Sequence, residues 1–161
     1  GDGAGASITI ASTGLARFMS TVGGASGIAS TNAGGSTRFD GDVTLTNGDT
    51  GSSFAGTTQL DGLNWSGFDG LTFTGAVTMS GGAVSLDSNG GAILLSSTLA
   101  GGGQDLTIAA GTAAGTTTFT GAVSGMGDGV GASITAAWSV RSASVTAATS
   151  AGGASAGVHS R

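Results

Sequence analysis

The stretch from Leu71 to Ser124 opens with Leu-Thr-Phe-Thr-Gly-Ala-Val-Thr-Met (71–79) and ends with Thr-Thr-Thr-Phe-Thr-Gly-Ala-Val-Ser (116–124). Both ends contain Thr-Phe-Thr-Gly-Ala-Val, at 72–77 and at 118–123. A looser motif has a large apolar residue first, a small residue third, and an apolar residue or threonine fifth. It begins at Phe18, Phe39, Phe54, Phe73, Leu95 and Phe119, in steps of 21, 15, 19, 22 and 24 residues. A repeat of roughly 20 residues with variable length is typical of a solenoid.

Each copy of the motif is interpreted as one coil of a parallel β-helix, so that successive copies are expected to take the same place in successive coils. Side chains alternate across a strand, so the first, third and fifth residues face the same side. The motif therefore places Phe73 and Val77 inside, with Gly75 between them at a bend. We predict an all-β fold, a parallel β-helix with irregular coils of roughly 20 residues. The phenylalanines of the motif are expected to be buried and stacked between coils, namely Phe39, Phe54, Phe73 and Phe119. The motif glycines Gly41, Gly75 and Gly121 are expected to lie at bends.

Composition excludes several classes of protein. Charged residues make up only 8% of the chain, which contains no Glu, Lys, Tyr, Pro or Cys. The formal net charge is −5 with only four arginines, so nucleic acid is a poor partner. No strongly apolar run is long enough to predict a membrane span, and no window has helical periodicity. We therefore expect almost no helix and no membrane insertion.

A second, longer repeat is present. Residues 1–9 read Gly-Asp-Gly-Ala-Gly-Ala-Ser-Ile-Thr, and residues 127–135 match them at eight of nine positions, 126 residues later. The match weakens after Ala137. We expect solenoid coils over 1–137, with a super-repeat restarting at 127, and a degenerate final coil, cap or frayed tail over 138–161. The chain is expected to be an excerpt of something longer.

Several stretches resemble the tandem repeats of very large bacterial surface proteins, the filamentous-haemagglutinin-like adhesins and autotransporter passengers. The stretches begin Phe73-Thr-Gly-Ala-Val-Thr-Met, Gly90-Gly-Ala-Ile-Leu-Leu, Asp105-Leu-Thr-Ile-Ala-Ala and Thr116-Thr-Thr-Phe-Thr-Gly-Ala-Val-Ser. The resemblance covers roughly residues 36–135. It implies export, a right-handed β-helix, an extracellular or cell-surface location, and a stalk or adhesive role. It carries over no catalytic residue.

One candidate site is a row of charged residues. Asp40 and Asp42 flank Gly41, Arg38 lies two residues before Asp40 on the same face, and Arg17 takes the equivalent position one coil earlier. Such a ladder could bind an acidic glycan or a metal. The alternative is an exposed row of ion pairs with a small effect on stability.

The other candidate is the loop over residues 60–71. It concentrates aromatic, acidic and amide groups that suit a sugar ring, and Asn64-Trp65-Ser66 fits the glycan-acceptor pattern. The residues concerned are Asp61, Asn64, Trp65, Phe68 and Asp69. The alternative is that both aromatic side chains cover the core at a long corner.

These features favour a structural stalk or adhesive solenoid segment without catalytic residues, metal or cofactor. Its expected partners are cell-surface glycans or identical chains joined end to end. A glycan-binding or polysaccharide-cleaving β-helix is the alternative, although acid–base groups are scarce. An ice-binding face is a second alternative, since the Thr-x-Thr pairs 72/74 and 118/120 face outward. The predicted column is interrupted at Arg38/Asp40, Ser53/Ala55 and Leu94/Ser96.

Overall fold

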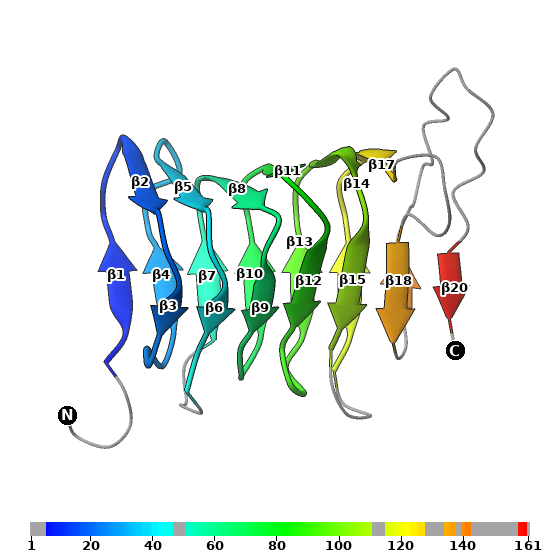
Figure 1. The fold of residues 1–161 in the computed structure, drawn as a ribbon, viewed down its shortest axis with the longest axis horizontal. Coiled ribbons are helices and arrows are strands. Elements are labelled where there is room, and N and C mark those ends of the chain that lie inside the picture. Colours follow the sequence, from blue (N-terminus) through cyan, green and yellow to red (C-terminus); the bar gives the residue numbers. More distant parts are fainter. Residues whose placement is uncertain are drawn as a thin grey trace.

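The computed structural model describes residues 6–46, 51–110, 115–127, 134–137, 140–142 and 158–160. Over these residues the chain forms strands and no helix, and three parallel sheets, of seven, six and seven strands, stack as a β-solenoid. The coils follow one another along the long axis of the molecule, from β1 at one end to β20 at the other (Figure 1). The predicted all-β parallel solenoid is confirmed.

Sheet A contains one strand from each coil. Its strands, in spatial order, are β1 (Ile8–Ile10), β4 (Ile28–Ser30), β7 (Ser52–Phe54), β10 (Leu71–Phe73), β13 (Ile93–Leu95), β16 (Thr117–Phe119) and β19 (Val140–Ser142).

Sheet B follows sheet A around each coil. Its strands are β2 (Leu15–Phe18), β5 (Ser36–Phe39), β8 (Thr57–Asp61), β11 (Val77–Ser80), β14 (Leu99–Gln104) and β17 (Val123–Met126).

Sheet C completes the coil. Its strands are β3 (Val22–Gly23), β6 (Val43–Thr44), β9 (Asn64–Ser66), β12 (Val84–Asp87), β15 (Leu106–Ala109), β18 (Ile134–Ala137) and β20 (Val158–Ser160). Because consecutive strands belong to different sheets, each strand pairs with the strand one full coil away. In sheet B, for example, Leu15 pairs with Ser36 and Ser36 with Thr57, which are 21 residues apart in each case.

The core runs through the stack as columns of inward-facing side chains. In sheet A, the register aligns Phe54, Phe73, Leu95 and Phe119, all of them buried. The Phe54 and Phe73 rings stack with centroids 5.3 Å apart. In sheet B, Phe18 stacks on Phe39, which is also buried. The predicted burial of Phe39, Phe54, Phe73 and Phe119 is confirmed. These side chains are buried because each coil covers the apolar residues of the coil before it.

The apolar motif marks two different corners of the coil. At Phe54, Phe73, Leu95 and Phe119 it joins sheet A to sheet B, whereas at Phe18 and Phe39 it joins sheet B to sheet C. The 15-residue step from Phe39 to Phe54 is therefore not a full coil. Phe39 meets Phe54 edge to face across the interior, at 5.6 Å. The expectation that every motif occupies the same place in a coil was wrong.

Glycine at these corners permits close approach between coils. Gly41, Gly75 and Gly121 all lie at bends, as predicted. A Cβ atom at Gly75 would lie 2.1 Å from the carbonyl oxygen of Gly56 on the preceding coil, and a Cβ at Gly121 equally close to that of Ser97. No side chain fits at such a distance without moving backbone.

The 126-residue super-repeat is out of phase with the coil. Ile8, in its first copy, lies in β1 and pairs with Ile28 in sheet A. Ile134, the equivalent residue of the second copy, lies in β18 and pairs with Leu106 in sheet C. The same local sequence thus occupies two different faces of the solenoid.

Most of the segment predicted as a degenerate coil, cap or tail, 138–161, lies outside the described residues. Within it, β19 extends sheet A by pairing with β16, and β20 extends sheet C by pairing with β18. Most of the two super-repeat starts, residues 1–9 and 127–135, also lies outside the described residues.

Candidate functional site

The predicted charge ladder lies on the outer face of sheet B. Arg17 on β2 aligns with Arg38 on β5, and Arg38 aligns with Gln59 on β8. The side chains of Arg17, Arg38 and Gln59 face outward because the next residue on each strand, Phe18, Phe39 or Leu60, is directed into the core. The sheet register therefore holds the two arginines in one column, one coil apart.

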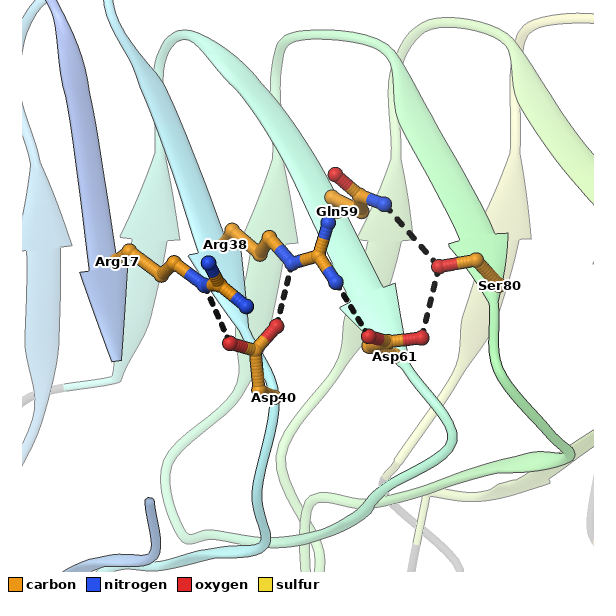
Figure 2. A network of polar contacts seen from close by, with 6 residues as sticks. All are labelled: Arg17, Arg38, Asp40, Gln59, Asp61 and Ser80. Atoms are coloured by element: carbon orange, nitrogen blue, oxygen red, sulfur yellow. Dashed lines mark hydrogen bonds and ion pairs between the residues drawn. The ribbon is translucent and has the colours of Figure 1, made fainter. Parts of the chain in front are cut away.

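The acidic groups form a second column beside the arginines. Asp61 aligns with Ser80 on β11, and Asp40 immediately follows Phe39, the residue that pairs with Leu60. Arg17 Nε lies 2.5 Å from Asp40 Oδ2, Arg38 Nε donates to Asp40 Oδ1, and Arg38 Nη2 lies 2.5 Å from Asp61 Oδ2 (Figure 2). Each carboxylate is thus shared between coils.

The network continues into uncharged groups. Ser80 Oγ donates to Asp61 Oδ1 at 2.9 Å, and Gln59 Nε2 donates to Ser80 Oγ at 3.1 Å (Figure 2). The resulting polar ladder, defined as Arg17, Arg38, Asp40, Gln59, Asp61 and Ser80, spans four coils. Its two arginines and two aspartates cancel in charge.

Electrostatics in the polar ladder favour the ion pairs over acid–base chemistry. The hydrogen bond from Arg38, reinforced by Arg17, holds the pKa of Asp40 below its ordinary value against the opposing effect of desolvation. The hydrogen bond to Asp40 raises the pKa of Arg38. A general acid at neutral pH needs the opposite shift, a raised carboxyl pKa. Asp40 is therefore suited to a structural ion pair.

The structure corrects the membership of the predicted ladder. Asp42 does not join the arginines: its Oδ1 accepts from the backbone N–H of Asn64 at 2.8 Å and from Asn64 Nδ2 at 3.4 Å. Asp61, predicted for the loop site, takes the place in the ladder instead. The spacing of 21 residues between Arg17, Arg38 and Gln59, and between Asp40 and Asp61, was the signal in the sequence that identifies these columns.

Trp65 is not available to a ligand, contrary to the loop-site hypothesis. It lies on β9, with only 2% of its surface exposed. Its ring meets Phe39 edge to face at 5.4 Å and Phe54 at 5.8 Å. The alternative weighed for this residue, an aromatic side chain covering the core, describes what the structure shows.

The remaining loop residues do not assemble around an aromatic surface. Phe68 is half-buried, while Asn64 and Asp69 are exposed. Asp69 has a left-handed backbone, φ 63°, in the turn before β10. Asn64 and Ser66 occupy the exposed face of β9, so the glycan-acceptor pattern lies at the surface. With Trp65 inside and Asp61 bonded to Arg38, the predicted five-residue patch does not form.

Sheet A carries the threonine rows of the ice-binding alternative. The register aligns Thr72 with Ser53 on one side and Leu94 on the other, and Leu94 with Thr118. Ser53 and Leu94 thus interrupt the threonine column, as predicted. Arg38 and Asp40 do not interrupt it, because they belong to sheet B and to the corner after it.

No group of three or more His, Cys, Asp or Glu side chains in the described ranges is arranged to hold a metal ion. Within the same ranges, no helix is long and apolar enough to cross a membrane. Comparison with known protein families, with curated proteins and with solved structures found no match to this chain.

Proposed function

We propose that this chain is a structural segment, a stalk, of a large exported bacterial surface fibre. The observation that carries the proposal is the continuous stacking of coils. In sheet A, each strand pairs with the strand of the next coil, from β1 to β19. One cluster of buried apolar side chains fills the interior that the three sheets enclose. Contacts between successive coils are the only ones such a rod needs, so its length can grow without altering its cross-section.

The outer surface also supports a structural role. The charges of the polar ladder are satisfied by one another across coils, and Trp65, the tryptophan of the predicted loop site, is buried. Aromatic anchors dominate binding hot spots. The stalk is therefore favoured over the adhesive role for this segment.

Export and a cell-surface location are proposed from the resemblance of the repeats to those of bacterial surface adhesins. The absence of cysteine in the sequence is compatible with this location, because ladder hydrogen bonds and a continuous core take the place of disulfide bonds. A long solenoid also buries more apolar surface in proportion to its size than a small secreted domain does.

The purified, folded chain provides the test against the alternatives. We expect the purified chain to give no signal on a glycan array and to release no reducing sugar or unsaturated product from acidic polysaccharides. In a separate experiment, antibodies against the chain should label intact bacteria that make the parent protein. Saturable glycan binding lost in Arg17→Ala would favour the glycan-binding alternative. Turnover lost in Asp40→Asn or Asp61→Asn would establish an enzyme, and labelling only after cell lysis would contradict the surface location.

A further inference from the structure

The uncharged end of the polar ladder brings a hydroxyl, a carboxylate and a carboxamide together. Ser80 Oγ donates to Asp61 Oδ1 at 2.9 Å and accepts from Gln59 Nε2 at 3.1 Å (Figure 2). The side chains come from neighbouring coils, since Gln59 and Asp61 lie on β8 and Ser80 lies on β11. A hydroxyl placed between a proton acceptor and a carbonyl group is the arrangement of an activated nucleophile.

The carboxylate of Asp61 is held in the orientation that a base needs. Its Oδ2 lies 2.5 Å from Arg38 Nη2, so Oδ1 is left to accept from the hydroxyl of Ser80. The residue after Ser80 also leaves room for Oδ1, because a Cβ atom at Gly81 would lie only 2.0 Å from it. The ion pair and the glycine together determine which carboxylate oxygen meets the hydroxyl.

The amide carbon of Gln59 lies within reach of the same hydroxyl. Its Cδ is one bond of about 1.3 Å from Nε2, and the terminal torsion of glutamine is broad. A rotation of the amide plane therefore presents Cδ to Ser80 Oγ without any movement of the backbone. Arg38 pairs with Gln59 in the register of sheet B, so its positive charge lies beside the amide on the outer face (Figure 2).

We propose that Ser80 and Gln59 react to form an ester that cross-links the two coils. Ser80 Oγ forms a bond to Gln59 Cδ while Asp61 Oδ1 takes the hydroxyl proton. The electron pair of the carbonyl bond moves to Oε1, where the charge of Arg38 stabilises it. As the carbonyl bond forms again, the Cδ–Nε2 bond breaks, and the nitrogen leaves as ammonia with the proton that Asp61 accepted. One O–H and one C–N bond are thus exchanged for one C–O and one N–H bond.

The arrangement is specific to one of the two glutamines of the chain. The amide of the other, Gln104, donates to the carbonyl oxygen of Gly102 at 3.3 Å. That acceptor carries no proton and is not a nucleophile. The inference does not depend on the stalk proposal, although a covalent bond between successive coils suits a rod that is pulled along its axis.

Mass spectrometry of the purified full chain, after incubation at neutral pH, tests the proposal. We expect the chain to be lighter than its sequence by one molecule of ammonia. When the denatured chain is digested with chymotrypsin, which cuts after Phe73, the peptides that carry Gln59 and Ser80 should remain joined. Mild alkali, which hydrolyses esters and leaves amides intact, should separate them. Peptides that separate without alkali overturn the proposal, and so does a joined pair that resists alkali.

Variants test the role of each group. Ser80→Ala and Gln59→Leu should abolish the joined peptide, whereas Ser80→Thr keeps the hydroxyl and should form it. Asp61→Asn should slow the reaction at least about 100-fold, because the amide does not accept the proton. The rate is followed in chain made by cell-free synthesis, and circular dichroism checks that each variant is folded.

The matched control is Gln104→Leu, which removes the other carboxamide and should cross-link like the original chain. A joined peptide in Ser80→Ala would contradict the assignment of the nucleophile. An unchanged rate in Asp61→Asn would contradict the assignment of the base. Loss of the joined peptide in Gln104→Leu would show that the wrong glutamine has been assigned.

Discussion

Arg38 reaches across one coil of the solenoid to Asp61, with Nη2 and Oδ2 2.5 Å apart. The same guanidinium donates to Asp40, two residues further along its own coil, and Asp40 also accepts from Arg17 on the coil before. One row of four charged groups therefore links three successive coils. It fixes the axial register of sheet B from the outside, as the stacked phenylalanines do from the inside.

Acidification should weaken this row. The pKa of Asp40 is lowered in the folded protein, so its ionised form stabilises the fold at any pH above the ordinary aspartate value. That contribution is lost as the pH falls from about 4 toward the lower value in the folded state. Thermal unfolding measured between pH 7 and pH 2 should show a steeper loss of stability in the original chain than in Asp40→Asn. The exposed Asp69→Asn is the control and should follow the original chain.

Trp65 is predicted to stabilise the fold by packing in the core. Trp65→Ala removes a buried ring from between Phe39 and Phe54 and should lower the free energy of unfolding by about 3–5 kcal/mol. Phe68→Ala, at a half-buried position, should cost clearly less. Denaturant unfolding measures both. Equal and small effects would mean that Trp65 does not occupy the core.

Gly75 is predicted to be the least replaceable residue at its corner. A side chain there meets the Gly56 carbonyl, so Gly75→Val must displace one coil from the next. Ala76→Val adds the same branched side chain at a half-buried neighbouring position and should be far better tolerated. Comparison of soluble yield and thermal midpoint for the two variants tests this. Similar losses in both would contradict the close approach at Gly75.

Much of the fold was predictable because solenoid coils repeat a simple local pattern. Alternation fixed the inward side of Phe73 and Val77, and the glycine between them identified a bend. The pattern does not say which corner it marks, because every corner needs a large residue, a small residue and another apolar residue. For this reason Phe18 and Phe39 were assigned to the same position as Phe54, although they lie at the next corner.

The candidate sites were less predictable because they depend on neighbours one coil away. The sequence leaves open whether Trp65 binds a ligand or covers the core, and the answer comes from its pairing with Val43 and Leu86 in sheet C, which directs its ring inward. Asp61 was assigned with Trp65 by closeness in sequence, whereas its partner Arg38 is 23 residues away. Thr37 and Thr58 are polar yet buried, since their column also contains Val77.

The phase of the super-repeat provides a separate test of register. Thr135 pairs with Thr107 in sheet C, although the equivalent Thr9 lies in sheet A. The chain contains no cysteine, so Thr107→Cys/Thr135→Cys should form a cross-link with a short bifunctional reagent. The pair Thr118→Cys/Thr135→Cys tests the in-phase alternative and should remain unlinked. The reverse pattern would show that both copies occupy sheet A.

The rigid stacking of coils along the solenoid axis is tested most directly by the distance between two spin labels, attached at Thr9→Cys and Thr118→Cys. The register of sheet A runs from Thr9 through Ala29, Ser53, Thr72 and Leu94 to Thr118. These five steps, at about 4.8 Å each, predict a separation of about 24 Å. Pulsed electron paramagnetic resonance should give one narrow distribution near that distance. A broad distribution, or a single peak at a clearly different distance, would contradict the stacked rod on which the stalk proposal rests.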